Sequence, residues 1–274
     1  MKSKTIKKIF NLSALAVVLF GAAGCQDVID IELRDADRKY VIEGDVILGT
    51  DSVVVRVSRT TSFFDETPPE TINSATVKIT MPNGDIVALN NVGNGYYKTN
   101  GLAITDNGTY GLNVQVENEE FTANTFMPAA LELDSLDSEF TEGIFGEAGY
   151  YDVYLNFQDP VGPNYYRVNT TLNGERLNEV FDIQLFDDRF SDGAYIRIPN
   201  FTQTYELGDT VQIELQSIDA RLYKFFETFT AIAGEGAGSP FSAAPANPET
   251  NIKGGALGYF GAFTSSKKEI IVVE

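Results

Sequence analysis

The sequence has no histidine, no tryptophan and a single cysteine, Cys25. Without histidine, the chain cannot form Ser-His-Asp or Cys-His nucleophile pairs, imidazole-ligated zinc sites or the usual proton shuttle near neutral pH. The lack of tryptophan weakens the case for a sugar-stacking site. An enzyme would have to use carboxylates or a lysine alone, and no spacing among the 39 acidic residues singles out an acid and a base. We therefore predict a protein that is not an enzyme and that has no catalytic residues and no cofactor.

The first 24 residues have the layout of a secretory signal peptide. Four lysines precede an apolar run at residues 9–20, which is too short to remain as a membrane-spanning helix, and small residues follow. Small residues directly before Cys25 resemble a bacterial lipobox, although Ala22 stands where leucine is usual. We expect Cys25 to be the lipid attachment site and the mature N-terminus. The alternative is an ordinary secreted protein with one stray cysteine.

The mature chain is strongly acidic. Removing residues 1–24 takes away four of the 20 basic residues and none of the 39 acidic ones, which leaves a formal charge of −23. This charge disfavours binding to nucleic acid and to anionic lipid headgroups. Membrane attachment would then depend on acyl chains, in which each buried methylene contributes about 0.8 kcal/mol.

Residues 25–37 form an acidic segment with too few apolar side chains to fold alone, so we predict a lipidated tether. Its acidic start resembles the signals that send some lipoproteins of the Bacteroidota to the outer leaflet. A solvated linker explains the charge equally well. We expect an outer-membrane, lipid-anchored protein that is exposed at the cell surface rather than facing the periplasm.

Residues 38–130 are predicted to form an immunoglobulin-like β-sandwich. Seven short alternating segments are separated by turn sequences about every ten residues, which is typical of such sandwiches. The run from Asp106 to Val114 resembles the tyrosine corner of immunoglobulin-like domains. Tyr110 would be the corner residue, and Leu112 stands where an antibody domain has its second cysteine.

Residues 131–274 are predicted to form a second β-rich domain with one packed helix at about 220–233. Asp219 is a candidate N-cap, and aromatic residues recur at helical spacing after it. Such a stripe is more often core packing than a ligand site. We expect small-residue strand structure at 254–263 and a closing strand at 270–273.

Two loop sequences of this half suggest ligands, although simpler explanations are available. Asp187, Asp188 and Asp192 could hold calcium, but they lack the regular spacing and closing glutamate of an EF-hand, so a polar loop is preferred. The glycines at 234–238 follow a helix instead of opening one, unlike a phosphate-binding loop. We therefore predict no metal or phosphate site.

Motifs throughout the mature chain resemble domain-of-unknown-function family 4249. They are Val28-Ile29-Asp30 after Cys25, Val41–Gly44, Ser74–Val77, Gly208–Asp219, the aromatic helix that follows, Pro245–Pro248 with Asn251-Ile252, and Gly255–Ala262. The family is similar in setting to outer-membrane lipoproteins of the Bacteroidota that are often encoded beside TonB-dependent receptors. The resemblance implies an accessory or substrate-capture partner of a TonB-dependent transporter and supplies no catalytic residues. The alternative is a structural or adhesive cell-surface module.

Tyr259, Phe260 and Phe263 are the candidate partner surface, because aromatic residues anchor many interfaces. The alternative is that all three pack inside a strand.

Three further positions, Ser52, Ser135 and Thr210, follow an aspartate and precede an apolar residue. This pattern resembles the O-glycosylation acceptor of the same bacterial group, although it also suits a strand start. If the sites are used, the intact mass of the mature protein will exceed that of the lipidated polypeptide, and the excess will fall when the three residues are changed to alanine. A mass that matches the lipidated polypeptide alone would dismiss the prediction.

Overall fold

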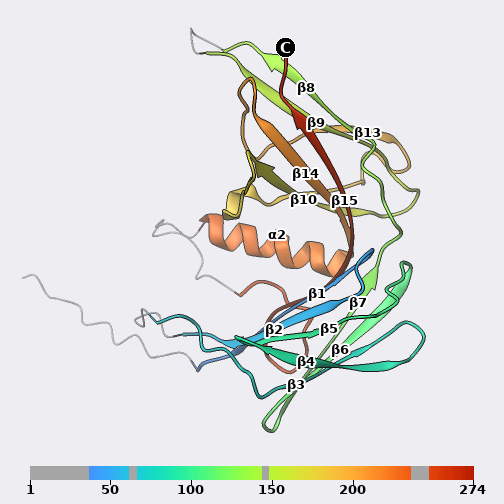
Figure 1. Cartoon of the computed structure of the whole chain (residues 1–274), viewed down its shortest axis with the longest axis vertical. Helices are drawn as coiled ribbons and strands as arrows, with labels where there is room; N and C mark the ends of the chain where they lie inside the picture. Colours follow the sequence, from blue (N-terminus) through green and yellow to red (C-terminus); the bar gives the residue numbers. More distant parts are fainter. Residues whose placement is uncertain (1–36, 62–66, 144–147, 236–246) are drawn as a thin grey trace, which may run out of the picture. The chain divides into compact units, whose positions relative to one another are not determined.

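The computed structural model describes residues 37–61, 67–143, 148–235 and 247–274, all of which belong to one compact unit from Asp37 to Glu274 (Figure 1). The predicted signal peptide, Cys25 and the tether up to residue 36 lie outside the described residues. The described part is mainly β, as the sequence predicts. Within it, no helix is both long and apolar enough to cross a membrane.

The N-terminal half contains the seven strands expected from the sequence. They are β1 (Tyr40–Ile47), β2 (Val53–Arg59), β3 (Thr76–Thr80), β4 (Ile86–Gly93), β5 (Tyr96–Thr99), β6 (Gly108–Val116) and β7 (Glu119–Met127). Strands β1, β2 and β5 form one layer, while β3, β6 and β7 form the other. Strand β4 passes between the layers, because it pairs first with β3 and then, near a register shift at Asn91/Gly93, with β5. Alternating apolar side chains from both layers fill one buried core.

The predicted tyrosine corner is present at the start of β6. The Tyr110 hydroxyl donates to the Thr105 carbonyl and accepts from the Thr105 N–H, both at 2.8 Å. Tyr110 and Leu112 are buried in the core. The hydroxyl therefore satisfies the backbone of the loop that precedes the strand.

The C-terminal half adds two sheet layers and a helix. Its elements are β8 (Ser135–Thr141), β9 (Tyr150–Gln158), β10 (Tyr165–Leu172), β11 (Glu175–Arg176), the 3-10 turn η1 (Val180–Asp182), β12 (Gln184–Asp187), β13 (Tyr195–Pro199), β14 (Thr210–Ile218), α2 (Ala220–Glu235) and β15 (Leu257–Ile271). Strands β13, β9 and β8 form a separate sheet in that order. This sheet packs against β10 and β14 through a second buried core.

Helix α2 matches the helix predicted at 220–233. The Asp219 carboxylate caps it by accepting from the Leu222 N–H at 2.7 Å. Phe225 and Phe226 are buried, and they pack with Phe263 of β15 in a third cluster. The aromatic stripe is thus core packing.

Strand β15 differs from the two short segments expected near the C-terminus. It is one strand of 15 residues. Its first half pairs in parallel with β1, from Val41↔Leu257 to Ile47↔Phe263. From Phe263 onward it pairs antiparallel with β14. The division predicted at residue 130 therefore falls between two cores that share one twelve-stranded sheet.

Glycine makes the pairing of β15 with β1 possible. Gly258 has a φ of +95°, and a Cβ there would lie 2.1 Å from the Ile42 carbonyl oxygen. A Cβ on Gly261 would lie 2.6 Å from Leu222 Cδ2 of helix α2. Only glycine at these two positions lets the strand approach β1 on one side and the helix on the other without displacing either neighbour.

We expect Gly258→Ala to destabilise the fold by roughly 2 kcal/mol or more, because it combines an unfavourable φ with a backbone clash. Gly255→Ala is the matched control, since Gly255 has a φ of +92° but open space where a Cβ would be. The control should lose only about 1 kcal/mol from the φ strain. Urea unfolding of both variants measures the difference, and equal losses would contradict the clash.

Candidate functional site

The structure places the predicted aromatic surface mostly in the interior. Phe260 and Phe263 are buried, and Tyr259 is half-buried, with its ring centroid 5.0 Å from that of Phe225. Phe260 packs against Gly44, and Phe263 lies in the cluster under helix α2. A partner could therefore not contact Phe260 or Phe263 without opening the fold, which corrects the sequence-based expectation for these two residues.

The three candidate glycosylation residues lie at or just before strand starts. Ser135 is exposed, whereas Ser52 and Thr210 are half-buried. Their modification stays a prediction.

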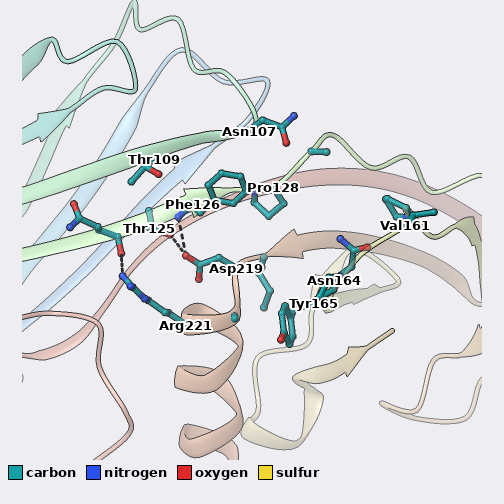
Figure 2. A pocket seen from close by; sticks show the side chains of 16 residues that line it. Asn107, Thr109, Thr125, Phe126, Pro128, Val161, Asn164, Tyr165, Asp219 and Arg221 are labelled. Atoms are coloured by element: carbon teal, nitrogen blue, oxygen red, sulfur yellow. Dashed lines mark hydrogen bonds between the residues drawn. The ribbon is translucent and has the colours of Figure 1, made fainter. Parts of the chain in front are cut away.

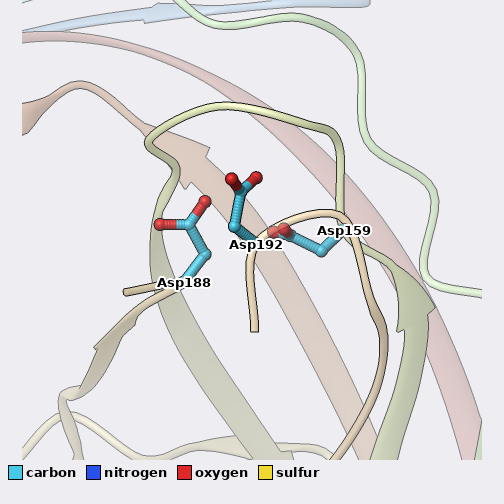
Figure 3. Close-up of side chains that lie close together, drawn as sticks. All are labelled: Asp159, Asp188 and Asp192. Carbon is cyan, nitrogen blue, oxygen red and sulfur yellow. The ribbon is translucent and has the colours of Figure 1, made fainter. Parts of the chain in front are cut away.

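Two loops of the C-terminal half bring three carboxylates together (Figure 3). Asp159, Asp188 and Asp192 each have an oxygen within 4.8 Å of the others. Sequence reasoning grouped Asp188 and Asp192 with Asp187, but Asp187 instead forms a bidentate pair with Arg189. It missed Asp159 because this residue lies on another loop, and its only local signal was the Asp-Pro turn after a strand.

Each carboxylate of this cluster accepts a hydrogen bond from the other loop. The bonds are Gly193 N to Asp159 Oδ2 (2.8 Å), Asn164 N to Asp188 Oδ2 (3.0 Å) and Gly162 N to Asp192 Oδ1 (2.7 Å). The Tyr166 hydroxyl also donates to Asp159. Calcium takes about six to eight oxygen ligands, and these three carboxylates already accept structural hydrogen bonds. We therefore describe them as a brace between the 159–164 and 187–193 loops.

The brace holds the Asp188 carboxylate in a buried site near two other negative charges, which disfavours its ionised form. Burial raises the pKa of Asp188, the Asn164 N–H opposes that shift, and the charges of Asp159 and Asp192 add to it. When folding raises the pKa of a carboxyl group, the group stabilises the folded state fully at pH values below its pKa in the unfolded chain, about 4. This stabilisation is lost as the pH rises through the pKa of the group in the folded protein. Near neutral pH the charge of Asp188 therefore opposes folding.

A groove of about 800 Å³ lies on one side of the 159–164 loop (Figure 2). Its other walls are the end of β7 and the first turn of α2. The groove is lined mainly by apolar and aromatic side chains, among them Phe126, Pro128, Val161, Pro163 and Tyr165. Grooves of this size and composition suit a small molecule or a segment of another chain.

The polar groups of this groove tie its walls together. The second oxygen of the Asp219 carboxylate accepts from the Thr125 hydroxyl and the Phe126 N–H, both at 2.9 Å. Arg221 Nη1 donates to the Asn124 carbonyl at 3.4 Å. Asp219 thus caps the helix and holds β7 beside it, so it is a structural residue of the groove. Sequence reasoning identified the cap but not the contact with β7, which lies more than 90 residues away.

A second groove, of about 660 Å³, adjoins the first and shares Pro163, Tyr165 and Ala220 with it. It is more polar, and its walls include Asp187, Arg189, Tyr223 and Glu227. A third, of about 490 Å³, shares Asn124 and Arg221 with the first groove and adds Lys224 and Lys253. The 159–164 loop therefore contributes residues to two open grooves.

We expect Asp188→Asn to be more stable than the natural protein at pH 7, because the amide removes the unfavourable charge while its oxygen can still accept from Asn164. The gain should shrink towards pH 4, as measured by urea unfolding at both values. Asp188→Ala is the control, and its loss of the acceptor should cost about 1–3 kcal/mol. A gain from Asp188→Asn that is equal at both pH values would contradict this electrostatic account.

Comparison with known proteins supplies a family but no activity. No curated protein sequence matches the chain. The family described as "Domain of unknown function (DUF4249)" matches residues 26–269, which include every residue of the grooves and the brace. The chain therefore belongs to the DUF4249 family.

Proposed function

We propose that this protein is a lipid-anchored binding protein of the outer membrane that serves as a non-enzymatic accessory or substrate-capture partner of a TonB-dependent transporter. The observation that carries the binding role is the pair of open grooves that the braced 159–164 loop helps to line. Binding surfaces work best when their walls are held in place before the ligand arrives. The carboxylate brace and the Asp219 contacts provide that rigidity here.

The anchoring role rests on the sequence around Cys25. Two or three acyl chains on this residue would give stable attachment without any help from surface charge. The segment from residue 26 to 36 would then separate the folded unit from the lipid, with a reach of at most about 3.5 Å per residue. A body held near the outer membrane in this way meets a membrane partner at high effective concentration.

The transporter partner is proposed from the resemblance of the sequence to outer-membrane lipoproteins of the Bacteroidota. A capture protein needs a ligand groove and a contact with the transporter on the same body. The grooves beside the 159–164 loop would supply the first, and the exposed loops near them would be available for the second.

Co-purification of the full-length lipoprotein from mildly solubilised membranes tests this proposal. We expect a β-barrel outer-membrane protein to be recovered with it, and deletion of the protein to reduce uptake of that transporter's substrate. Cys25→Ser is the control for anchoring, since it should lose the lipid mass and release the protein from the membrane. Recovery of no β-barrel protein under several detergents would count against the transporter role. Normal uptake together with a damaged cell surface would favour the structural alternative.

A further inference from the structure

The two braced loops expose large apolar side chains at their tips. Phe190 of the 187–193 loop is 96% exposed, and Val161 of the 159–164 loop is 89% exposed. Side chains with this exposure gain almost no hydrophobic stabilisation from folding. Single exposed apolar residues are common, but these two lie on loops that touch each other. A Cβ built on Gly193 would lie only 3.1 Å from Val161 Cγ2.

The backbones that carry these two side chains are held in place. Gly162, next to Val161, donates its N–H to Asp192, and Gly193 donates to Asp159. Within the second loop, Ser191 N donates to the Asp188 carbonyl at 2.7 Å. Binding to such fixed loops would require little further ordering, which is the property of an interface anchor.

We propose that Val161 and Phe190 form a protein-docking tip, and that its partner presents an apolar pocket rimmed by lysine or arginine. The basic rim follows from charge complementarity. Residues 159–164 and 187–193 contain four aspartates and one arginine, a formal net charge of −3. Asp159 and Asp188 are buried, whereas Asp192, two residues from Phe190, is exposed. Complementary charge at the rim would steer the partner and fix its orientation.

The same charge argues against two other occupants of the tip. Anionic lipid headgroups would be repelled by the aspartates as the apolar side chains approached the bilayer. In a symmetric contact between two copies of this chain, each tip would meet a tip of the same charge. A basic protein surface carries neither penalty.

The location of the tip connects it with the grooves. Val161 lines the groove of about 800 Å³, and the neighbouring Gly162 and Asp192 line the groove of about 660 Å³. A partner that encloses the tip would therefore also contact residues that line both grooves. This inference rests on the proposed function for the existence of a membrane partner and adds the surface through which that partner binds.

Photo-crosslinking in cells tests the tip directly. A benzophenone amino acid is placed at position 190 of the full-length lipoprotein, with position 86 as the control because Ile86 is 67% exposed on β4 of the N-terminal half. We expect position 190, and not position 86, to give a single protein adduct. Mass spectrometry should place the crosslink at an apolar site flanked by lysine or arginine.

Substitution at the tip gives a second, quantitative test. The double variant Val161→Ser, Phe190→Ser should fold normally, because both side chains are exposed. The amount of partner that co-purifies with it should fall by about tenfold or more. Raising the salt concentration should weaken the natural complex through the charged rim. The variant Ile86→Ser should retain the partner in full.

Several results would overturn the proposal. Adducts from position 190 to lipid alone, or to a second copy of the chain, would identify a different occupant. Undiminished partner recovery by the double variant would show that the tip is not the docking surface, while leaving the proposed transporter role intact. Recovery of no partner by any form, together with no adduct from position 190, would contradict both.

Discussion

The parallel pairing of β15 with β1 is the contact on which the rest of the structure depends. It joins strands more than 200 residues apart in the chain, and it exists because Gly258 lets the two backbones meet. The remainder of β15 continues into the second core beside β14, so one strand belongs to both halves. Helix α2 then lies on this shared strand over Gly261, which brings its first turn to the edge of β7. The groove is a consequence of that placement.

A buried polar cluster reinforces the same junction. Arg167 of β10 donates from Nε to Gln216 of β14 at 2.7 Å, and its guanidinium carbon lies 4.2 Å from the Phe226 ring centroid. Burial raises the pKa of Asp45 on β1, whereas the charge of Arg167 and a hydrogen bond from Tyr259 lower it. Opposite charges that are buried near one another contribute little net stability, but loss of one of them leaves the other uncompensated. The cluster therefore favours the one arrangement in which strands of both halves lie beside α2.

The sequence predicted the local features of this fold well and the long-range ones poorly. The seven N-terminal strands, the Tyr110 corner and helix α2 follow from alternation, turn residues and capping, all of which act within a few residues. Strand β15 appeared as two segments because its glycines look like breaks when the partner β1 is not known. Phe260 looked like a contact residue for the same reason, since the space that buries it is created by Gly44 of that partner. The sequence grouped Asp188 and Asp192 of the brace because they are close in the chain, but it did not identify Asp159, which lies on a distant loop.

The negative charge of the chain, and the short distance over which that charge acts, explain why a small apolar docking tip would suit this protein. The formal net charge of −19 disfavours approach to any anionic surface, yet this effect is screened beyond about 8 Å at physiological ionic strength. Lipidation would keep the folded unit near the membrane regardless of that charge, and specificity would then have to arise from contacts at short range. Apolar side chains on braced loops supply such contacts, because their burial is favourable only when a complementary pocket excludes water from them. The aspartates of the same loops would add specificity, since they favour a basic protein pocket over anionic lipid.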